Sequence, residues 1–544
     1  MAKTRSQQQG PVLSQRDRKK AAAQSRAEAE AAQKDKQRID EEEAKKEDLI
    51  QRTPIPQEQF LNWLAWFCKT HFTTSRFVQL SALLFVVQQA YLAFEEEYQS
   101  EKDINLLIST VCALVALLAG IAITIRVKFQ IRKQKGETGP VPLPPWNAVY
   151  LVFLAVMLPF VYKRDLLLYN AALTSSVLDL PWFAKIAIQV SLVSSNTSHN
   201  DTLFNLKVIG LNTIVQYFLT QITELKSLDE VEVSLFSILL TDVYIIDSQE
   251  LYFVVLQKLL VSFGVGASVL YAITRVWTSN TTARSCVLLA SWGAAFVGTT
   301  LHQLDPILGK NSLVWLYEYI TATSTRISII ALWLISLVLL IPTIFSYKVQ
   351  FSPNFRRKIW HFLVLGLVSL PLHLDPEFVK LSLSGCLVLF LIVEQTRYLK
   401  LHPFGEFLDQ HLRTFADFRD ERGPIIFSYI YLIIGITLPI LFNNSVAGLV
   451  VLGVGDSLAS IIGSNWGEIK WSRSNKTVEG TMGFIVASFL VSALFKLLGW
   501  FFEDSSYNAL LLACTVSGIL EGNSDMNDNI MIPGFMCVLL EATN

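Results

Sequence analysis

The sequence contains little cysteine, little charge and none of the common phosphate-binding motifs. Its six cysteines among 544 residues form no C-x-x-C pair and no cluster with histidine, which excludes the usual zinc sites and predicts buried apolar thiols. Charged residues make up 17% and nearly cancel to a net charge of −1, which argues against a nucleic-acid partner, because such a partner requires a basic surface. No G-x-x-x-x-G-K-[ST], H-R-D or D-F-G motif occurs, which excludes the P-loop and common protein-kinase classes.

Apolar residues make up 52% of the chain. Windows long enough to cross about 30 Å of hydrocarbon recur throughout the sequence. We therefore predict an all-α, polytopic integral membrane helical bundle with about 12 to 16 transmembrane helices. The stretch 166–245 is more amphipathic and is compatible with either spanning or lying on the surface. The clearer windows are 77–94, 105–125, 146–162, 251–274, 284–301, 327–346, 359–374, 378–395, 425–442, 446–463, 481–502 and 507–522.

Three parts of the chain differ in composition. Residues 1–56 alternate Lys and Arg with Asp and Glu among Ala and Gln, which is typical of a charged, largely solvated or disordered tail. Residues 57–345 form an N-terminal transmembrane region to which no role is assigned. Residues 346–544 form a C-terminal transmembrane domain that carries the candidate catalytic residues and the loop 464–482.

Positive charge is distributed unequally between the two ends of the last six predicted spans. The segments 347–358, 396–424 and 464–480 contain twelve Lys and Arg residues, whereas the three opposite turns contain none. By the positive-inside rule the first side is cytosolic. The polar clusters of the C-terminal third therefore gather at the cytosolic face, where a water-soluble anionic substrate would meet them.

Asp456 lies inside an apolar window, where a charge costs a few kcal/mol and usually marks a functional site. Small residues at Gly455, Ala459 and Gly463 repeat every four positions around it and favour close approach of a neighbouring helix. The alternative is that Asp456 pairs with a nearby Lys or Arg and only fixes helix packing.

The loop that follows Asp456 combines basic side chains, hydroxyls and a predicted helix start. Backbone N–H groups at a helix N-terminus favour an anion, and together with the lysines they predict a triphosphate site. Simple anchoring of a cytosolic loop is the alternative. The residues concerned are Lys470, Lys476, Thr477, Gly480 and Thr481, with Glu479 among them.

Two acids on the same face favour a metal ion. Mg²⁺ prefers oxygen ligands and usually reaches a protein through one or two carboxylates plus substrate phosphates. We name Asp456 and Asp528 as the metal ligands, with Glu521 and Asp525 in the same stretch of acids. Two spans separate Asp456 from Asp528, so this prediction requires their helices to be neighbours.

Further charged residues near the cytosolic face are accessory candidates. Snorkelling to lipid headgroups is their default explanation, and a lone histidine is more often a hydrogen-bonded packing residue than a proton carrier. Glu394 and Arg397 are expected to pair with each other. The accessory candidates are Arg357, Lys358, His361, Asp420 and Arg422.

Several separated motifs resemble one family of enzymes. The run V-G-D-S-L-A-S-I-I-G-S at 454–464 is followed by G-E-I-K-W at 467–471 and K-T-V-E-G-T at 476–481. In order and spacing these are similar to the dolichol kinase family, and the resemblance covers about residues 345–544. Further matches are R-K-I-W-H (357–361), D-E-R-G-P (420–424), I-Y-L-I-I-G (430–435), L-E (520–521) and D-N (528–529).

The resemblance implies transfer of the γ-phosphate of CTP, with Mg²⁺ as cofactor, to the hydroxyl of dolichol for protein glycosylation. It implies a multi-pass protein of the endoplasmic reticulum membrane whose active site faces the cytosol. The segment from Gly467 to Met482 matches the CTP-binding loop of that family. Asn475 replaces a usual lysine, and the residues after Glu521 depart from the family pattern, which weakens the case for Asp525.

Under this interpretation Lys476, with Lys470 as second choice, binds the triphosphate, while Asp456 and Asp528 hold Mg²⁺ or accept the alcohol proton. Glu479 is a weaker candidate for either role. The alternatives are a phosphatidate cytidylyltransferase, a kinase of another lipid alcohol, or, from another class, a polytopic transporter. A transporter would be expected to show two related halves, and no internal repeat is visible.

Overall fold

In the computed structural model, the described residues are 74–101, 154–155, 157–159, 162–177, 180–194, 202–223, 228, 230–277, 281–346, 353–413, 424–471, 475–524 and 527–543. All of them belong to one structural unit, which comprises residues 71–125 and 144–544. Over these ranges the regular structure is helical, and the sole bridge of β type joins Lys470 to Thr477.

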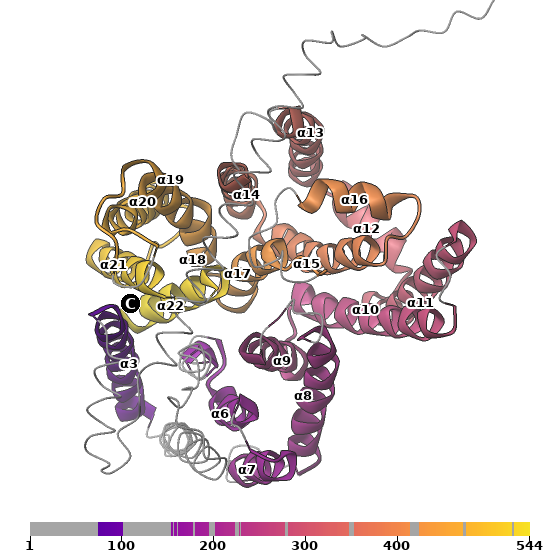
Figure 1. The fold of residues 1–544 in the computed structure, drawn as a ribbon, viewed down its shortest axis with the longest axis horizontal. Coiled ribbons are helices and arrows are strands. Elements are labelled where there is room, and N and C mark those ends of the chain that lie inside the picture. Colours follow the sequence, from indigo (N-terminus) through magenta and orange to yellow (C-terminus); the bar gives the residue numbers. More distant parts are fainter. Residues whose placement is uncertain are drawn as a thin grey trace, which may run out of the picture. The chain divides into compact units, whose positions relative to one another are not determined.

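The described parts of the amphipathic stretch 166–245 are helical (Figure 1). None of the helices in these parts is among those long and apolar enough to cross a membrane. The N-terminal elements are α3 (Thr74–Glu101), η1 (Arg164–Leu166), α6 (Leu167–Leu173), η2 (Thr174–Val177), α7 (Trp182–Ser194), α8 (Thr202–Thr223), α9 (Glu230–Ile245), α10 (Leu251–Val276), α11 (Thr282–Leu308), α12 (Ser312–Thr321) and α13 (Ser324–Ser346).

The C-terminal helices follow the predicted spans closely. Local capping sets several of their starts: Asp375, before Pro376, accepts a hydrogen bond from the backbone N of Phe378, and Ser506 accepts one from Ala509. The elements are α14 (Pro353–Leu374), α15 (Pro376–Tyr398), α16 (Phe404–Leu412), α17 (Ser428–Asn443), α18 (Ala447–Val450), η5 (Val451–Gly455), α19 (Asp456–Trp466), α20 (Val478–Leu497), α21 (Tyr507–Asn523) and α22 (Asp528–Thr543).

The prediction of an all-α, polytopic membrane protein is confirmed. Among the described residues six helices are long and apolar enough to cross a membrane, or seven if the bent pair α12 and α13 forms one span. The predicted total of about 12 to 16 spans also relies on windows such as 105–125, which lie outside the described residues. That total stays a prediction.

The last helix, α22, was not predicted. Pro533 and Gly534 lie in its middle, and both residues are poor helix formers. Its residues from Ile530 to Leu540 are nevertheless buried, and it packs against α17, α21 and α3. Tertiary packing therefore overrides the low helix propensity of this segment.

A group of neighbouring helices surrounds the end of the C-terminal domain that carries Asp456. Helix α19 packs against α20, α20 against α21, and α21 against α22, as the gold and yellow ribbons of Figure 1 show. Helix α3, from the N-terminal region, packs against both α21 and α22. A long-range contact therefore joins the region of unassigned role to the candidate catalytic domain.

The predicted pairing of Glu394 with Arg397 is confirmed. Nη2 of Arg397 lies 2.6 Å from Oε1 of Glu394, and both side chains are buried. The same Oε1 accepts a hydrogen bond of 2.7 Å from the backbone N of Ile426, and Arg397 also donates to the carbonyl of Pro424. This pair therefore ties the end of α15 to the chain just before α17.

Candidate active site

A π-helical turn interrupts the span that carries Asp456. The turn η5 covers Val451–Gly455 and lies between α18 and α19, with Asp456 as the first residue of α19. Such π-bulges occur frequently at functional sites. The turn is buried throughout, and Asp456 itself is 7% exposed. The carboxylate is therefore enclosed by protein, as the cost of placing a charge in hydrocarbon requires.

The stripe of small residues packs against α20, as predicted. A Cβ atom added to Gly455 would lie 2.4 Å from Oγ of Ser488, and one added to Gly480 would lie 2.8 Å from the carbonyl oxygen of Ala459. Gly463 meets Thr477 at the start of α20 in the same way, at 2.9 Å. Close approach of α19 and α20 brings the loop between them next to Asp456.

Helix α14 supplies two basic partners to Asp456. The ammonium group of Lys358 forms an ion pair with Oδ2 of Asp456, and Nδ1 of His361 lies 3.4 Å from the same oxygen. Both side chains are almost completely buried. The alternative in which Asp456 pairs with a nearby lysine therefore describes part of its environment, but the same carboxylate also faces other acids.

The tautomer of His361 follows from its hydrogen-bond partners. Nδ1 lies 3.0 Å from the carbonyl oxygen of Leu452, and a carbonyl oxygen can only accept a hydrogen bond. Nδ1 therefore carries the hydrogen, and in the neutral ring Nε2 is an acceptor. His361 is thus fixed to the π-helical turn that precedes Asp456.

Lys476 contacts two acids from helices that follow it in sequence. Its Nζ lies 2.7 Å from Oε1 of Glu521, 2.8 Å from the carbonyl oxygen of Glu521 and 3.2 Å from Oδ2 of Asp528. Burial acts to lower the pKa of the Lys476 ammonium, but the charges of Glu521 and Asp528 outweigh that effect and hold its pKa above the ordinary value. Lys476 therefore stays positively charged at neutral pH.

Three carboxylates converge beside these lysines. Ligand oxygens of Asp456, Glu521 and Asp528 all lie within 4.8 Å of one another. Asp456 and Glu521 are buried, and the Asp528 side chain is 30% exposed. The prediction that Asp456 and Asp528 come together is confirmed. Oxygen ligands from carboxylates are the set that Mg²⁺ prefers, so the residues present fit such an ion.

A short hairpin carries Lys476 to this cluster. The backbone N of Trp471 donates to the carbonyl of Lys476 at 3.0 Å, and that of Val478 donates to Ile469 at 2.8 Å. Nε1 of Trp471 donates to Oγ1 of Thr481 at 2.9 Å. A Cβ atom added to Gly522 would lie 2.3 Å from that same Oγ1, so the hairpin packs directly on α21 beside Glu521.

Most of the backbone N–H groups at the start of α20 already donate hydrogen bonds within the protein. The N–H of Gly480 donates to Oγ1 of Thr477, which caps the helix, and the N–H of Val478 donates to Ile469. Thr477 and Thr481 are both buried. The structure therefore gives Thr477, Gly480 and Thr481 a clear part in the hairpin and cap, and leaves Lys476 as the residue that faces the acids.

The remaining predicted loop residues lie apart from the acid cluster. Glu479 accepts a hydrogen bond of 3.1 Å from the backbone N of Ile469 and is not one of the three convergent acids. Lys470 is exposed and pairs through its backbone with Thr477. Gly467 ends α19, where an added Cβ would lie 2.6 Å from Oγ1 of Thr477.

The accessory candidates divide into three groups. Lys358 and His361 contact Asp456 directly. Arg357 lies one residue earlier on α14 and is partly buried. Asp420 and Arg422 lie outside the described residues, as does Asp525.

Glu521 was not among the predicted metal ligands, and no contact between α3 and the site was predicted. For Glu521 the sequence did offer one indication of a functional role, because this acid lies at the end of an apolar window. Oγ of Ser75 donates to Oδ1 of Asn523 at 2.8 Å, and Gln79 donates to the carbonyl oxygen of the same residue. Because Asn523 follows Glu521 by two residues, α3 supports the end of α21 that carries this acid. No local pattern in the sequence indicated that contact.

Fold and site together define a polytopic membrane protein with a buried, lysine-flanked cluster of carboxylates. A family model described as the dolichol kinase N-terminal domain matches residues 25–247. No solved structure gives a significant match.

Curated relatives carry the same family name. The chain is 38% identical to the dolichol kinase of Saccharomyces cerevisiae over 403 residues, which cover 73% of this chain and 77% of the relative. It is 38% identical to dolichol kinase sec59 of Schizosaccharomyces pombe over 43% of this chain and 51% of the relative. For the dolichol kinase of Homo sapiens the identity is 31%, over 45% of this chain and 50% of the relative. The chain therefore belongs to the dolichol kinase family.

Proposed function

We propose that this protein is a lipid kinase of the endoplasmic reticulum membrane that transfers the γ-phosphate of CTP to the terminal hydroxyl of dolichol. The product, dolichyl phosphate, would serve protein glycosylation. One observation supports this most strongly: Asp456, Glu521 and Asp528 converge within 4.8 Å beside Lys476, in a chain of the dolichol kinase family.

In the transfer, the hydroxyl oxygen of the lipid forms a bond with the γ-phosphorus, and the bond from that phosphorus to the β–γ bridging oxygen breaks. CDP leaves, and the hydroxyl proton passes to a carboxylate. Phosphoryl transfer needs positioning and charge neutralisation more than covalent chemistry. A cluster of acids that holds a divalent cation, flanked by fixed lysines, provides both.

The proposed metal ligands are Asp456, Asp528 and, in addition to the sequence prediction, Glu521. A bound Mg²⁺ would supply charge neutralisation for the phosphates. The ammonium of Lys476 forms ion pairs with two of these acids, and that of Lys358 with the third. With the three acids ionised, two lysines leave one negative charge without compensation, which favours a cation.

Lys476 is the proposed ligand of the triphosphate, and Lys470, exposed on the same hairpin, is the second. Because Thr477, Gly480 and Thr481 already make internal hydrogen bonds or close packing contacts, we assign them chiefly to the shape of the loop that presents Lys476. Gly467 belongs to the same loop. Asp456 or Asp528 is the proposed acceptor of the alcohol proton.

We place the site at the cytosolic face on the distribution of positive charge. Twelve Lys and Arg residues lie on the side of the loop 464–480 and none in the three opposite turns, which supports a cytosolic orientation. CTP would then reach the acids from water, while the lipid stays in the bilayer.

One labelling experiment tests the reaction type. Purified protein receives dolichol and Mg²⁺ with CTP labelled at either the γ- or the α-phosphate. A kinase transfers only the γ-label to lipid, whereas a cytidylyltransferase acting on phosphatidate would transfer the α-label and would not act on dolichol. Parallel reactions with ATP, GTP and UTP test the choice of CTP. Transfer of no label to any long-chain alcohol would contradict the proposal.

A further inference from the structure

Glu521 lies in the last turn of α21, which ends at Asn523. The last carbonyl groups of a helix have no partner within the helix, and helix ends fray. Gly522, between these two residues, lowers the helix propensity of the turn further. Yet an oxygen of Glu521 lies within 4.8 Å of oxygens from two other carboxylates, so this turn needs contacts from outside α21 that hold it in place.

Two side chains from outside α21 bind carbonyl groups of this turn. Nζ of Lys476 donates to the carbonyl oxygen of Glu521 at 2.8 Å, and Nε2 of Gln79, on α3, donates to that of Asn523. Under the proposed function Lys476 also binds the triphosphate, so its contact with Glu521 changes when the nucleotide is bound. Gln79 lies outside the loop proposed for the nucleotide, and its bond to Asn523 is independent of that change.

Further hydrogen bonds fix the side chains on both sides of the α3 contact. Nη1 of Arg76 donates to Oε1 of Gln79 at 3.1 Å, so the amide of Gln79 turns its N–H group toward Asn523. Oγ of Ser75 donates to Oδ1 of Asn523 at 2.8 Å, and Nδ2 of Asn523 donates to the carbonyl oxygen of Ile519 at 2.9 Å. Ser75, Gln79 and Asn523 are each at most 5% exposed. The contact is therefore shielded from water and specific in its geometry.

Helix α3 packs against both helices that carry the later acids. It contacts α21 and α22, and Figure 1 shows it, in indigo, beside the yellow ribbons of these two helices. Glu521 lies on α21, and Asp528 begins α22. The hydrogen bonds of Ser75 and Gln79 connect α3 directly to the turn of Glu521.

We propose that Ser75 and Gln79 of α3 are positioning residues, which hold Glu521 at the place where the three acids can bind one metal ion. The inference rests on the proposed function, because the ion is the Mg²⁺ of that reaction. The two residues act through Glu521 and do not touch the ion themselves. The N-terminal region thereby takes part in building the metal site.

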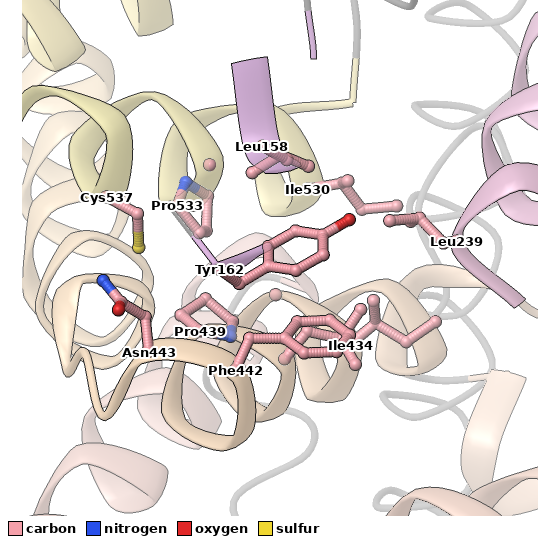
Figure 2. Close-up of a pocket in the computed structure, with 13 residues that line it drawn as sticks. Leu158, Tyr162, Leu239, Ile434, Pro439, Phe442, Asn443, Ile530, Pro533 and Cys537 are labelled. Atoms are coloured by element: carbon pink, nitrogen blue, oxygen red, sulfur yellow. The ribbon is translucent and has the colours of Figure 1, made fainter. Parts of the chain in front are cut away.

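A second contact of the N-terminal region with α22 lies away from the acids. Figure 2 shows the ring of Tyr162 between Phe442 of α17 and Pro533 of α22, and it stacks on Phe442 with centroids 4.4 Å apart. The cavity beside the ring has a volume of only about 50 Å³. Ile530, which lines it, is two residues from Asp528 and so on the opposite side of the helix, since a turn takes about 3.6 residues. Tyr162 therefore offers a packing contact that does not face the acids.

The test measures Mg²⁺ binding without turnover. The dissociation constant is obtained from the rise of the melting temperature with Mg²⁺ concentration, in detergent and without nucleotide or dolichol. Gln79→Leu should raise it by about tenfold or more, and the milder Ser75→Ala by about threefold. Gln88→Leu, on the exposed side of α3, is the matched control and should keep the wild-type value. A wild-type value in Gln79→Leu, or a wild-type protein that Mg²⁺ does not stabilise, would overturn the proposal.

Two further variants separate positioning from a general loss of stability. Tyr162→Leu loses the stacking on Phe442 and the hydrogen bond to Asp242, so it should lower the melting temperature but leave the Mg²⁺ dissociation constant unchanged. In the Glu521→Gln variant, Gln79→Leu should not weaken Mg²⁺ binding further, because the acid through which Gln79 acts has already lost its charge. Additive effects of Gln79→Leu and Glu521→Gln, or weaker binding in Tyr162→Leu, would overturn the proposal.

The outcomes also separate this inference from the proposed function. Protein that phosphorylates dolichol and binds Mg²⁺ equally well with Gln79→Leu keeps the function and removes the positioning role. Protein that transfers phosphate to no alcohol, yet binds Mg²⁺ more weakly with Gln79→Leu, keeps the positioning role and removes the kinase reaction.

Discussion

The ammonium group of Lys476 lies 2.7 Å from Oε1 of Glu521, although 45 residues separate the two in sequence. The first belongs to the hairpin that follows Asp456, and the second to the end of α21. Their contact joins the loop proposed for the nucleotide to the acids proposed for the metal. Each of the following predictions tests a part of that arrangement.

The first prediction concerns the pH dependence of the Lys476 contact. Because the folded-state pKa of Lys476 is raised, its stabilising effect is fully present below the ordinary lysine pKa of about 10.4 and is lost as pH rises through the higher folded value. The melting temperature of Lys476→Met should therefore lie below that of the wild type by a constant amount up to about pH 10. The difference should shrink in more alkaline buffer, as read by thermal unfolding in detergent.

A difference in melting temperature between Lys476→Met and the wild type that widens in alkaline buffer would contradict the predicted direction. The variant Glu521→Gln supplies a control, because it removes the strongest favourable charge on Lys476. In the Glu521→Gln variant, Lys476→Met should lower the melting temperature by less than it does in the wild type.

The second prediction separates the catalytic part of Asp456 from its pairing with Lys358. Asp456→Asn should reduce turnover at least about 100-fold, because it removes a charge from the proposed metal site. It should also cost about 3 kcal/mol or more in stability, because it leaves the buried Lys358 ammonium without its charged partner. Turnover and thermal unfolding are measured on the same preparations.

The double variant Lys358→Met with Asp456→Asn gives the control. Removing both charges should recover much of the stability, since no buried ion remains unpaired, but none of the turnover. Near-normal turnover in Asp456→Asn would remove Asp456 from the mechanism.

The third prediction concerns Glu521, which the structure adds to the metal ligands. Glu521→Gln should raise the Mg²⁺ concentration for half-maximal activity by about tenfold or more, since loss of residues around a metal typically weakens binding by that order. Glu503→Gln, which neutralises an exposed acid in the turn before α21, is the matched control and should keep the wild-type titration. Identical Mg²⁺ curves for the two variants would exclude Glu521 as a ligand.

The fourth prediction tests the close packing of α19 on α20. Gly480→Ala should destabilise the protein by about 1–3 kcal/mol, because the added methyl group would lie 2.8 Å from the backbone oxygen of Ala459. Gly366→Ala, on α14, is the matched control, because nothing lies within 4 Å of its added Cβ. That control should be neutral or stabilising by up to about 1 kcal/mol. Equal melting temperatures would show that α20 can move away from α19 without cost.

Much of the fold could be predicted because membrane insertion depends on local composition. Predicted windows such as 251–274 and 378–395 lie within α10 and α15, since about 20 consecutive apolar residues suffice to cross the hydrocarbon. Helix α22 was missed for the same reason. Its Pro533 and Gly534 lower local helix propensity, and only its burial against α17 and α21 compensates.

The candidate site could be predicted in part. An acid inside an apolar window is costly wherever the chain places it, so Asp456 was visible from its sequence position alone. Glu479 was equally conspicuous in its motif, yet its carboxylate accepts from Ile469 of the hairpin. Glu521 was less conspicuous but lies against Lys476. The direction in which a side chain points depends on helix packing, which a motif does not contain.

The sequence by itself determined that this chain is helical, enters the membrane many times and carries acids inside apolar windows, where a charge has a high free-energy cost. Each of these properties follows from the composition of a short window. Only the tertiary structure decided that Asp456, Glu521 and Asp528 converge, that Lys358 and Lys476 form ion pairs with them, and that α3 supports the end of α21. These contacts join residues far apart in the chain, and their formation depends on how whole helices pack together.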